Sequence, residues 1–134
     1  MTSVGGRIIA TGAMLAALAV AIGAFGAHAL EGRVSADMLA NYHTGAQYHF
    51  LHALGIIAVG LLALYLRGDD RAGDAALARL RWSAVFMLTG IVLFSGSLYT
   101  MALTGMRWLG AITPLGGVCF LVAWCLFAWA ATEV

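Results

Sequence analysis

The stretch from Gly6 to Ala27, GRIIATGAMLAALAVAIGAFGA, contains one charged residue, Arg7, in an otherwise apolar run. An apolar run of about 20 residues is long enough to cross about 30 Å of hydrocarbon as an α-helix. Three further runs of this kind follow, at residues 49–66, 82–103 and 113–131. The sequence therefore predicts an all-α integral membrane protein, a bundle of four transmembrane helices.

The composition supports the same conclusion. Hydrophobic residues make up 63% of the 134 residues and charged residues only 10%, whereas about a quarter of a soluble domain is charged. The length predicts a single transmembrane domain over residues 1–134. A net charge of +1 without a basic run excludes nucleic acid as a partner, and the predicted surroundings are the lipid bilayer.

The arginines predict the orientation of the chain. We expect the first run to be retained as a span, because it is longer than the apolar core of a signal peptide. Four spans then divide the cations five against two, with Arg33 and Arg107 on one side and, on the other, Arg7, Arg67, Arg71, Arg79 and Arg81. The positive-inside rule places both termini in the cytoplasm.

The segment before the second span has a different pattern. Ser35 can cap a helix in which Met38, Leu39 and Tyr42 lie on one side and polar residues on the other. We expect a short amphipathic segment here. If it continued unbroken to Leu66, the helix would be about 46 Å long, so we expect it to protrude, tilt, or bend near Gly45.

Small residues predict where the helices pack, because they let helix backbones approach closely in lipid. In the third span they recur at seven-residue intervals at Ser83, Gly90, Ser97 and Thr104. In the first span the predicted face consists of Gly12, Ala16, Ala19, Gly23 and Gly26. The same residues would also allow a second copy or another subunit to approach.

A cluster of polar residues is predicted in the non-cytoplasmic half. Polar groups at that depth cost free energy unless they find partners. On a helix Asn41, Tyr48 and His52 share one face, and Tyr42 and His49 form a neighbouring pair.

Three interpretations of this cluster remain open. One is an interhelical hydrogen-bond network with Ser95, Ser97, Tyr99 or Thr100 as partners. Another is a metal or haem site using His49 and His52 with His28 or His43. The third is a pocket for a lipid or quinone. No carboxylate or cysteine completes a ligand set, so we predict no metal and no cofactor.

An enzyme would need a nucleophile or an acid–base pair, and no such arrangement is visible. The acids outside the loop at 67–81 are Glu31, Asp37 and Glu133, all at predicted interfaces. No span carries a central carboxylate, which gives transport no support.

Four motifs resemble the YgdD-like family of small bacterial membrane proteins: Gly23–Leu30 (GAFGAHAL), Tyr48–Leu54 (YHFLHAL), Phe94–Tyr99 (FSGSLY) and Arg107–Gly117 (RWLGAITPLGG). Small mitochondrial transmembrane proteins of animals are similar to the same family. The resemblance implies four helices in a bacterial inner membrane, and the family is one of unknown function. Its motif residues correspond to Phe25, Gly26, His28, Tyr48, His52, Ser95, Gly96, Ser97, Tyr99, Arg107, Trp108, Thr113 and Pro114.

These observations lead to one hypothesis about the site and one about function. His28, His52, Tyr99 and Arg107 are expected to converge beneath the non-cytoplasmic surface; Arg107 and Trp108 could instead hold a lipid headgroup or a partner. We expect a non-enzymatic accessory or scaffold subunit of a membrane complex or homo-oligomer, and alternatively a ligand binder or small transporter. The candidate site residues are His28, Asn41, Tyr48, His49, His52, Tyr99, Arg107 and Trp108.

Overall fold

A computed structural model describes residues 3–68 and 73–133. Four helices are long and apolar enough to cross a membrane, Val4–Leu30, Ala36–Arg67, Asp74–Thr104 and Arg107–Ala131, and no strand occurs in the described ranges. This confirms the predicted all-α membrane fold. The elements in order are α1 (Val4–Phe25), the π-helix η1 (Gly26–Leu30), α2 (Ala36–Arg67), α3 (Asp74–Gly90), the π-helix η2 (Ile91–Ser95), α4 (Gly96–Thr104), the 3-10 helix η3 (Arg107–Ala111) and α5 (Thr113–Ala131).

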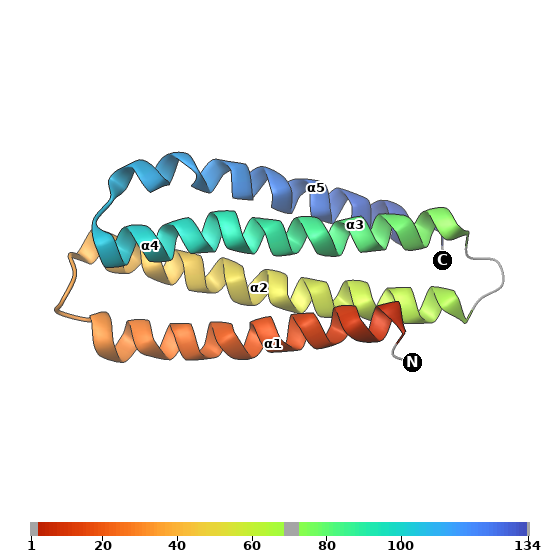
Figure 1. Ribbon diagram of the computed structural model, residues 1–134, viewed down its shortest axis with the longest axis horizontal. Helices are drawn as coiled ribbons and strands as arrows, with labels where there is room; N and C mark the ends of the chain where they lie inside the picture. Colours follow the sequence, from red (N-terminus) through yellow and green to blue (C-terminus); the bar gives the residue numbers. More distant parts are fainter. Residues whose placement is uncertain (1–2, 69–72, 134) are drawn as a thin grey trace.

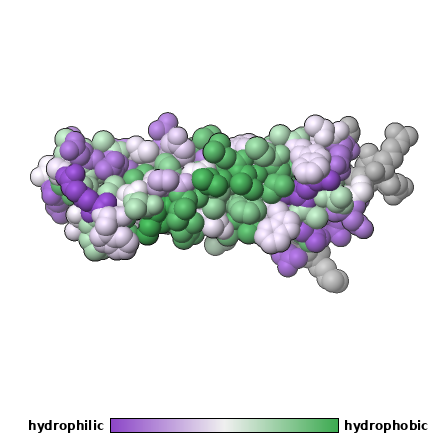
Figure 2. Space-filling view, turned by 90° about the horizontal axis from the view of Figure 1, so that it is seen from above, coloured by the Kyte–Doolittle hydropathy of each residue, from purple (hydrophilic) through white to green (hydrophobic). Residues whose placement is uncertain are grey.

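The surface shows the distribution expected of a membrane-spanning protein. On the face seen in Figure 2, hydrophobic residues predominate in the middle and hydrophilic residues gather toward both ends. The two termini lie at the same end (Figure 1), which we call the terminal end. Tyr65, Trp82 and Trp129 are exposed near this end, as is typical of aromatic side chains at a membrane interface.

Helix α2 corrects one expectation. The amphipathic residues from Ala36 onward do not form a separate segment, because they continue without interruption into a helix of 32 residues, about 48 Å long. Gly45 lies inside this helix and marks a contact: a Cβ atom there would stand 2.9 Å from the ring of Tyr99. Its lack of a side chain therefore admits the Tyr99 ring and does not break the helix.

Helix α1 packs along α2 and touches no other helix extensively (Figure 1). Its buried face consists of small residues at seven-residue intervals, Gly5, Gly12, Ala19 and Gly26. A Cβ atom at Gly12 would stand 2.8 Å from the Ala53 carbonyl oxygen of α2, so the backbones approach as closely as glycine permits. Ala16 and Gly23, which we expected on this face, are only half-buried.

The second helix pair joins α3, η2 and α4 to α5, and three members of the seven-residue repeat lie in this contact. Ser83 donates a hydrogen bond to the Ala123 carbonyl at 2.8 Å, and the Ser97 and Thr113 hydroxyls are 2.8 Å apart. Gly90 lies against the Phe120 ring. Thr104, the fourth member of the repeat, is exposed, because α4 ends there and Gly105 reverses the chain with a φ of 75°.

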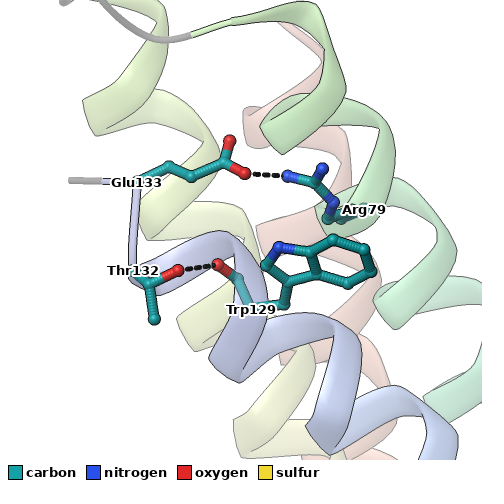
Figure 3. A network of polar contacts seen from close by, with 4 residues as sticks. All are labelled: Arg79, Trp129, Thr132 and Glu133. Atoms are coloured by element: carbon teal, nitrogen blue, oxygen red, sulfur yellow. Dashed lines mark hydrogen bonds and ion pairs between the residues drawn. The ribbon is translucent and has the colours of Figure 1, made fainter.

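A group of contacts fastens the end of α5 to α3 at the terminal end (Figure 3). The guanidinium of Arg79 forms an ion pair with Glu133 and lies over the Trp129 ring, 4.1 Å from its centroid. The Thr132 hydroxyl donates to the Trp129 carbonyl at 2.7 Å. Arg79 therefore serves α5 both as a charge partner and as a cation on an aromatic face.

Candidate functional site

The candidate site is a cluster of histidine and tyrosine side chains inside the membrane-spanning region. His49 of α2 has 2% of its surface exposed. Its Nδ1 is 3.2 Å from the Tyr99 hydroxyl of α4. The Leu15 backbone carbonyl of α1 also approaches the ring, yet Nε2 makes no hydrogen bond of normal geometry to any described residue. His49 thus joins α2 to α4 and keeps one buried polar atom unpaired.

Tyr42 extends this cluster to α1. Its hydroxyl donates to the Ile22 carbonyl at 2.9 Å, and its ring centroid is 5.0 Å from that of Tyr99. The ring fits because Gly26 has no side chain: a Cβ atom there would stand 2.5 Å from the ring. The Tyr42–Tyr99–His49 group therefore binds three helices together, as the network interpretation predicted.

His52 belongs to a second, aromatic group on the neighbouring face of α2, one turn further along the helix. It is 3% exposed, and its Nδ1 donates to the Tyr48 carbonyl at 2.7 Å. Its ring stacks on Phe120 of α5, with centroids 3.4 Å apart and an angle of 10° between the planes. Because Nδ1 carries the proton, Nε2 of the neutral ring presents an acceptor lone pair.

An open groove lies beside His52. It has a volume of about 520 Å³ and runs between α2, η2 and α5, within the range of about 300–1,000 Å³ for ligand pockets. Its walls include Tyr48, His52, Phe94, Phe120 and Trp124. His52 supplies its one imidazole, halfway along α2.

The π-helical turn η2 places the remaining predicted partners. Ser95 is fully buried and its hydroxyl has no hydrogen-bond partner among the described residues. The Ser97 hydroxyl donates to the Phe94 carbonyl at 2.9 Å, and the Thr100 hydroxyl to its own helix at Gly96. Of the expected partners, only Tyr99 therefore bonds a histidine. A π turn often occurs at a functional position.

The expected convergence of His28, His52, Tyr99 and Arg107 is not observed. His28 lies in η1, and Arg107 and Trp108 lie in η3. All three are exposed, and both elements are at the end of the molecule opposite the termini. Asn41 is half-buried and stands apart from the stacked pair of Tyr48 and His52. The physical reason is that an arginine retains its hydration at the interface, whereas His52 lies halfway along the spanning helix.

The arrangement is not that of a metal centre. His49 and His52 are three residues apart, but the first contacts Tyr99 and the second Phe120. Within the described ranges no three histidine, cysteine or acidic side chains stand close enough to hold an ion. What the cluster can do chemically is donate and accept hydrogen bonds in an apolar environment.

Sequence reasoning missed the role of Phe120. Its ring covers both His52 and the space at Gly90, but in the sequence it is one aromatic residue among many in an apolar run. The spacing of 30 residues between Gly90 and Phe120 becomes a contact only through the antiparallel packing of α3 and α5. No local pattern reports such a contact.

Comparison with known proteins gives the family but no reaction. Residues 22–117 match a family described as a protein of unknown function (DUF423). The chain is 47% identical over 125 residues, 93% of this chain and 95% of the relative, to UPF0382 membrane protein YwdK of Bacillus subtilis. It is 42% identical to UPF0382 membrane protein SSP2132 of Staphylococcus saprophyticus, over 87% of this chain and 88% of the relative.

A similar match extends to a Gram-negative bacterium. The chain is 41% identical to UPF0382 inner membrane protein YgdD of Escherichia coli K12, over 80% of this chain and 75% of the relative. No solved structure matches the chain significantly. With four membrane-spanning helices and these relatives, the protein is a multi-pass membrane protein that belongs to the DUF423 family, the family of YgdD, whose function is unknown.

Proposed function

We propose that this protein is a non-enzymatic accessory or scaffold subunit that binds another transmembrane helix through the outer face of α1. The observation that carries the proposal is a face of exposed alanines, Ala10, Ala13, Ala17, Ala21 and Ala24. We call it the alanine face. These residues recur every three or four positions, and at 100° per residue they point away from the face that packs on α2.

The composition of the alanine face favours protein over lipid as its neighbour. Lipid-facing surfaces have no need of small residues, whereas helix–helix interfaces in membranes are enriched in them. Bulky side chains such as Met14 and Val20 are exposed on α1 beside the alanine face and not within it, whereas the exposed face of α5 carries bulky side chains such as Leu115, Leu121 and Trp129. Both helices lie at the edge of the fold, so their different surfaces support different neighbours.

The buried cluster supports a structural role in this proposal. Tyr42, His49 and Tyr99 hold α2 to α1 and α4, which fixes the helix that carries α1. The acidic side chains in the described part of the chain lie near helix ends, so the histidines have no carboxylate beside them with which to share a proton. A non-enzymatic role is consistent with this arrangement.

The test is native mass spectrometry of protein extracted gently from its own membrane. We expect the wild type to carry a second copy or another membrane chain, which the mass distinguishes. The double variant Ala13→Leu/Ala17→Leu should lose that partner. Ala128→Leu makes the same change at an exposed position of α5 and should retain it.

Two results would contradict the proposal. One is a wild type that is monomeric at its natural abundance. The other is a double variant that keeps the partner while its thermal unfolding matches that of the wild type. Because the alanine face points away from α2, the substitutions should leave the isolated fold intact, and a lost partner can then be assigned to the face itself.

A second candidate function is favoured by the groove beside His52. The Nε2 lone pair could accept a hydrogen bond from a hydroxyl of a lipid or a quinol, whose apolar part would lie against Phe120 and Trp124. His52→Phe would keep the stacking but remove the acceptor. Loss of a co-purified lipid or quinone in this variant, but not in His43→Phe at an exposed position of α2, would favour ligand binding.

A further inference from the structure

A second groove lies at the terminal end, between α1 and α3, and α2 forms its floor. Its volume is about 360 Å³. The walls are apolar and include Ile8 of α1, Ile56 of α2, and Val85 and Leu88 of α3, but Arg7 and Arg81 also line it. We call it the arginine groove. It is separate from the histidine cluster and from the alanine face.

The two arginines lie at nearly the same depth in the membrane. We compare their depths along α2. Arg7 of α1 lies beside the α1 residues that pack against Gly60 of α2, and Met87 of α3 packs against Gly55 of α2. Gly60 is five positions nearer the terminal end than Gly55, and Arg81 is six positions nearer it than Met87. Each step covers about 8–9 Å of helix. Arg7 and Arg81 therefore approach the groove from opposite walls at one level.

That level coincides with the membrane–water interface. Trp82 directly follows Arg81 in the sequence and is 59% exposed, and aromatic residues of this kind lie at headgroup depth. The apolar walls at Val85 and Leu88 are one and two turns farther from the terminal end. The groove thus has cationic residues where headgroups lie and an apolar channel where acyl chains lie.

Neither arginine has its charge neutralised by the part of the protein that the structure describes. Arg79 pairs with Glu133, whereas Arg7 and Arg81 form no ion pair with a described carboxylate and both are exposed. Two guanidinium groups beside one cleft, neither paired with a described carboxylate, attract an anion, and each offers a fork of donors that matches phosphate oxygens.

We propose that the arginine groove is a binding site for one anionic phospholipid. Arg7 and Arg81 hold its phosphate, and one acyl chain lies between α1 and α3 against Ile8, Ile56 and Leu88. Basic pockets between transmembrane helices are a recognised way to bind anionic headgroups. The charge pair selects the headgroup, and the apolar walls distinguish a lipid from a soluble anion.

The test is native mass spectrometry of purified protein with an equimolar mixture of phosphatidylglycerol and phosphatidylcholine that carry the same acyl chains. We expect the wild type to retain phosphatidylglycerol preferentially. Each arginine near the surface contributes about a fivefold preference, so Arg7→Gln/Arg81→Gln should lower the preference about 25-fold. Arg33→Gln, an exposed cation near the opposite end, should leave it unchanged.

A groove-filling variant tests the acyl chain. Ala84→Phe places a ring in the groove but keeps both arginines, and it should release phosphatidylglycerol, while Ala128→Phe on α5 should not. A wild type without headgroup preference, or a double glutamine variant that keeps it, would overturn the proposal. Displacement of the lipid by millimolar inorganic phosphate would overturn it too, since the site would then recognise phosphate alone.

Discussion

The hydrogen bond between His49 and Tyr99 joins two helices where water has no access. The exposed fraction of His49 is 2%, so a partner lost there cannot be replaced by solvent. Hydrogen bonds between membrane helices contribute about 0.6 kcal/mol on average and about 1.7 kcal/mol at most. Since Nε2 of His49 makes no hydrogen bond of normal geometry to a described residue, loss of the Nδ1 bond would leave the ring with only the nearby Leu15 carbonyl.

Tyr99→Phe is therefore expected to destabilise the fold by about 1–2 kcal/mol. The ring would still fill the space at Gly45, so the loss isolates the hydroxyl. Thr100→Val provides the control, because the Thr100 hydroxyl is exposed and bonds its own helix. The measurement is unfolding in mixed micelles with increasing denaturing detergent. Equal stability of Tyr99→Phe and wild type would show that the His49 contact contributes nothing.

At the scale of the elements, the contact of α3, η2 and α4 with α5 depends on close approach. Gly116 and Gly117 are adjacent in α5 but face different surroundings. A Cβ atom at Gly116 would overlap the backbone of Phe94 in η2, whereas one at Gly117 would have no neighbour within 4 Å. Substitution by alanine at each of the two positions therefore separates the effect of close packing on stability from the effect of helix propensity.

We expect Gly116→Ala to destabilise the protein by about 1–3 kcal/mol, because the added methyl group forces α5 and η2 apart. Gly117→Ala should be neutral or stabilising by up to about 1 kcal/mol, since alanine favours a helix over glycine. Thermal unfolding followed by circular dichroism in micelles measures both. If the two variants unfold at the same temperature, α5 does not pack on η2 as described.

The sequence predicted these elements unevenly, for physical reasons. The repeat of Ser83, Gly90 and Ser97 predicted a packing face, because a helical period is a local property, but it did not show that α5 packs there. The prediction that Thr104 belongs to this packing face was wrong, because α4 ends there and this end depends on Gly105. The sequence left open whether α2 continues through Gly45, since a glycine in a helix reads as a weak point until its neighbour, the Tyr99 ring, is known.

The contacts of the histidines were also predicted only in part. Their spacing correctly separated the pair of Tyr48 and His52 from that of Tyr42 and His49. It could not show that His52 stacks on Phe120, because that contact joins helices far apart in the sequence. Nor could it show that His28 and Arg107 stay apart from His52 and Tyr99, since that depends on how the ends of different helices are arranged in space.

At the scale of the whole molecule, the charges predict how the protein lies in its membrane. The helix ends at the terminal end carry Arg7, Arg67, Arg79 and Arg81, and the segments at the opposite end carry Arg33 and Arg107. Arg71, which the sequence assigns to the same side as the first four, lies outside the described residues. The positive-inside rule assigns the terminal end to the cytoplasm.

A fluorescent-protein fusion at the C-terminus should therefore fluoresce, because its folding requires the cytoplasm, and an alkaline phosphatase fusion there should be inactive. A phosphatase inserted between Gly32 and Arg33 should be active. As a charge control, Arg79→Glu/Arg81→Glu should lower the fraction of molecules in this orientation. Active phosphatase at the C-terminus of the wild type would reverse the assignment.

The pairing of α1 with α2 and of α3 with α5 also sets the order in which helix contacts can form during synthesis of the chain. The N-terminal half emerges from the ribosome first, and α1 can pack against α2 before the remaining helices are synthesised. His49 and His52 then face lipid, since their partners Tyr99 and Phe120 are still to come. An incomplete chain would thus expose two imidazole rings to the membrane, which quality-control proteases could recognise.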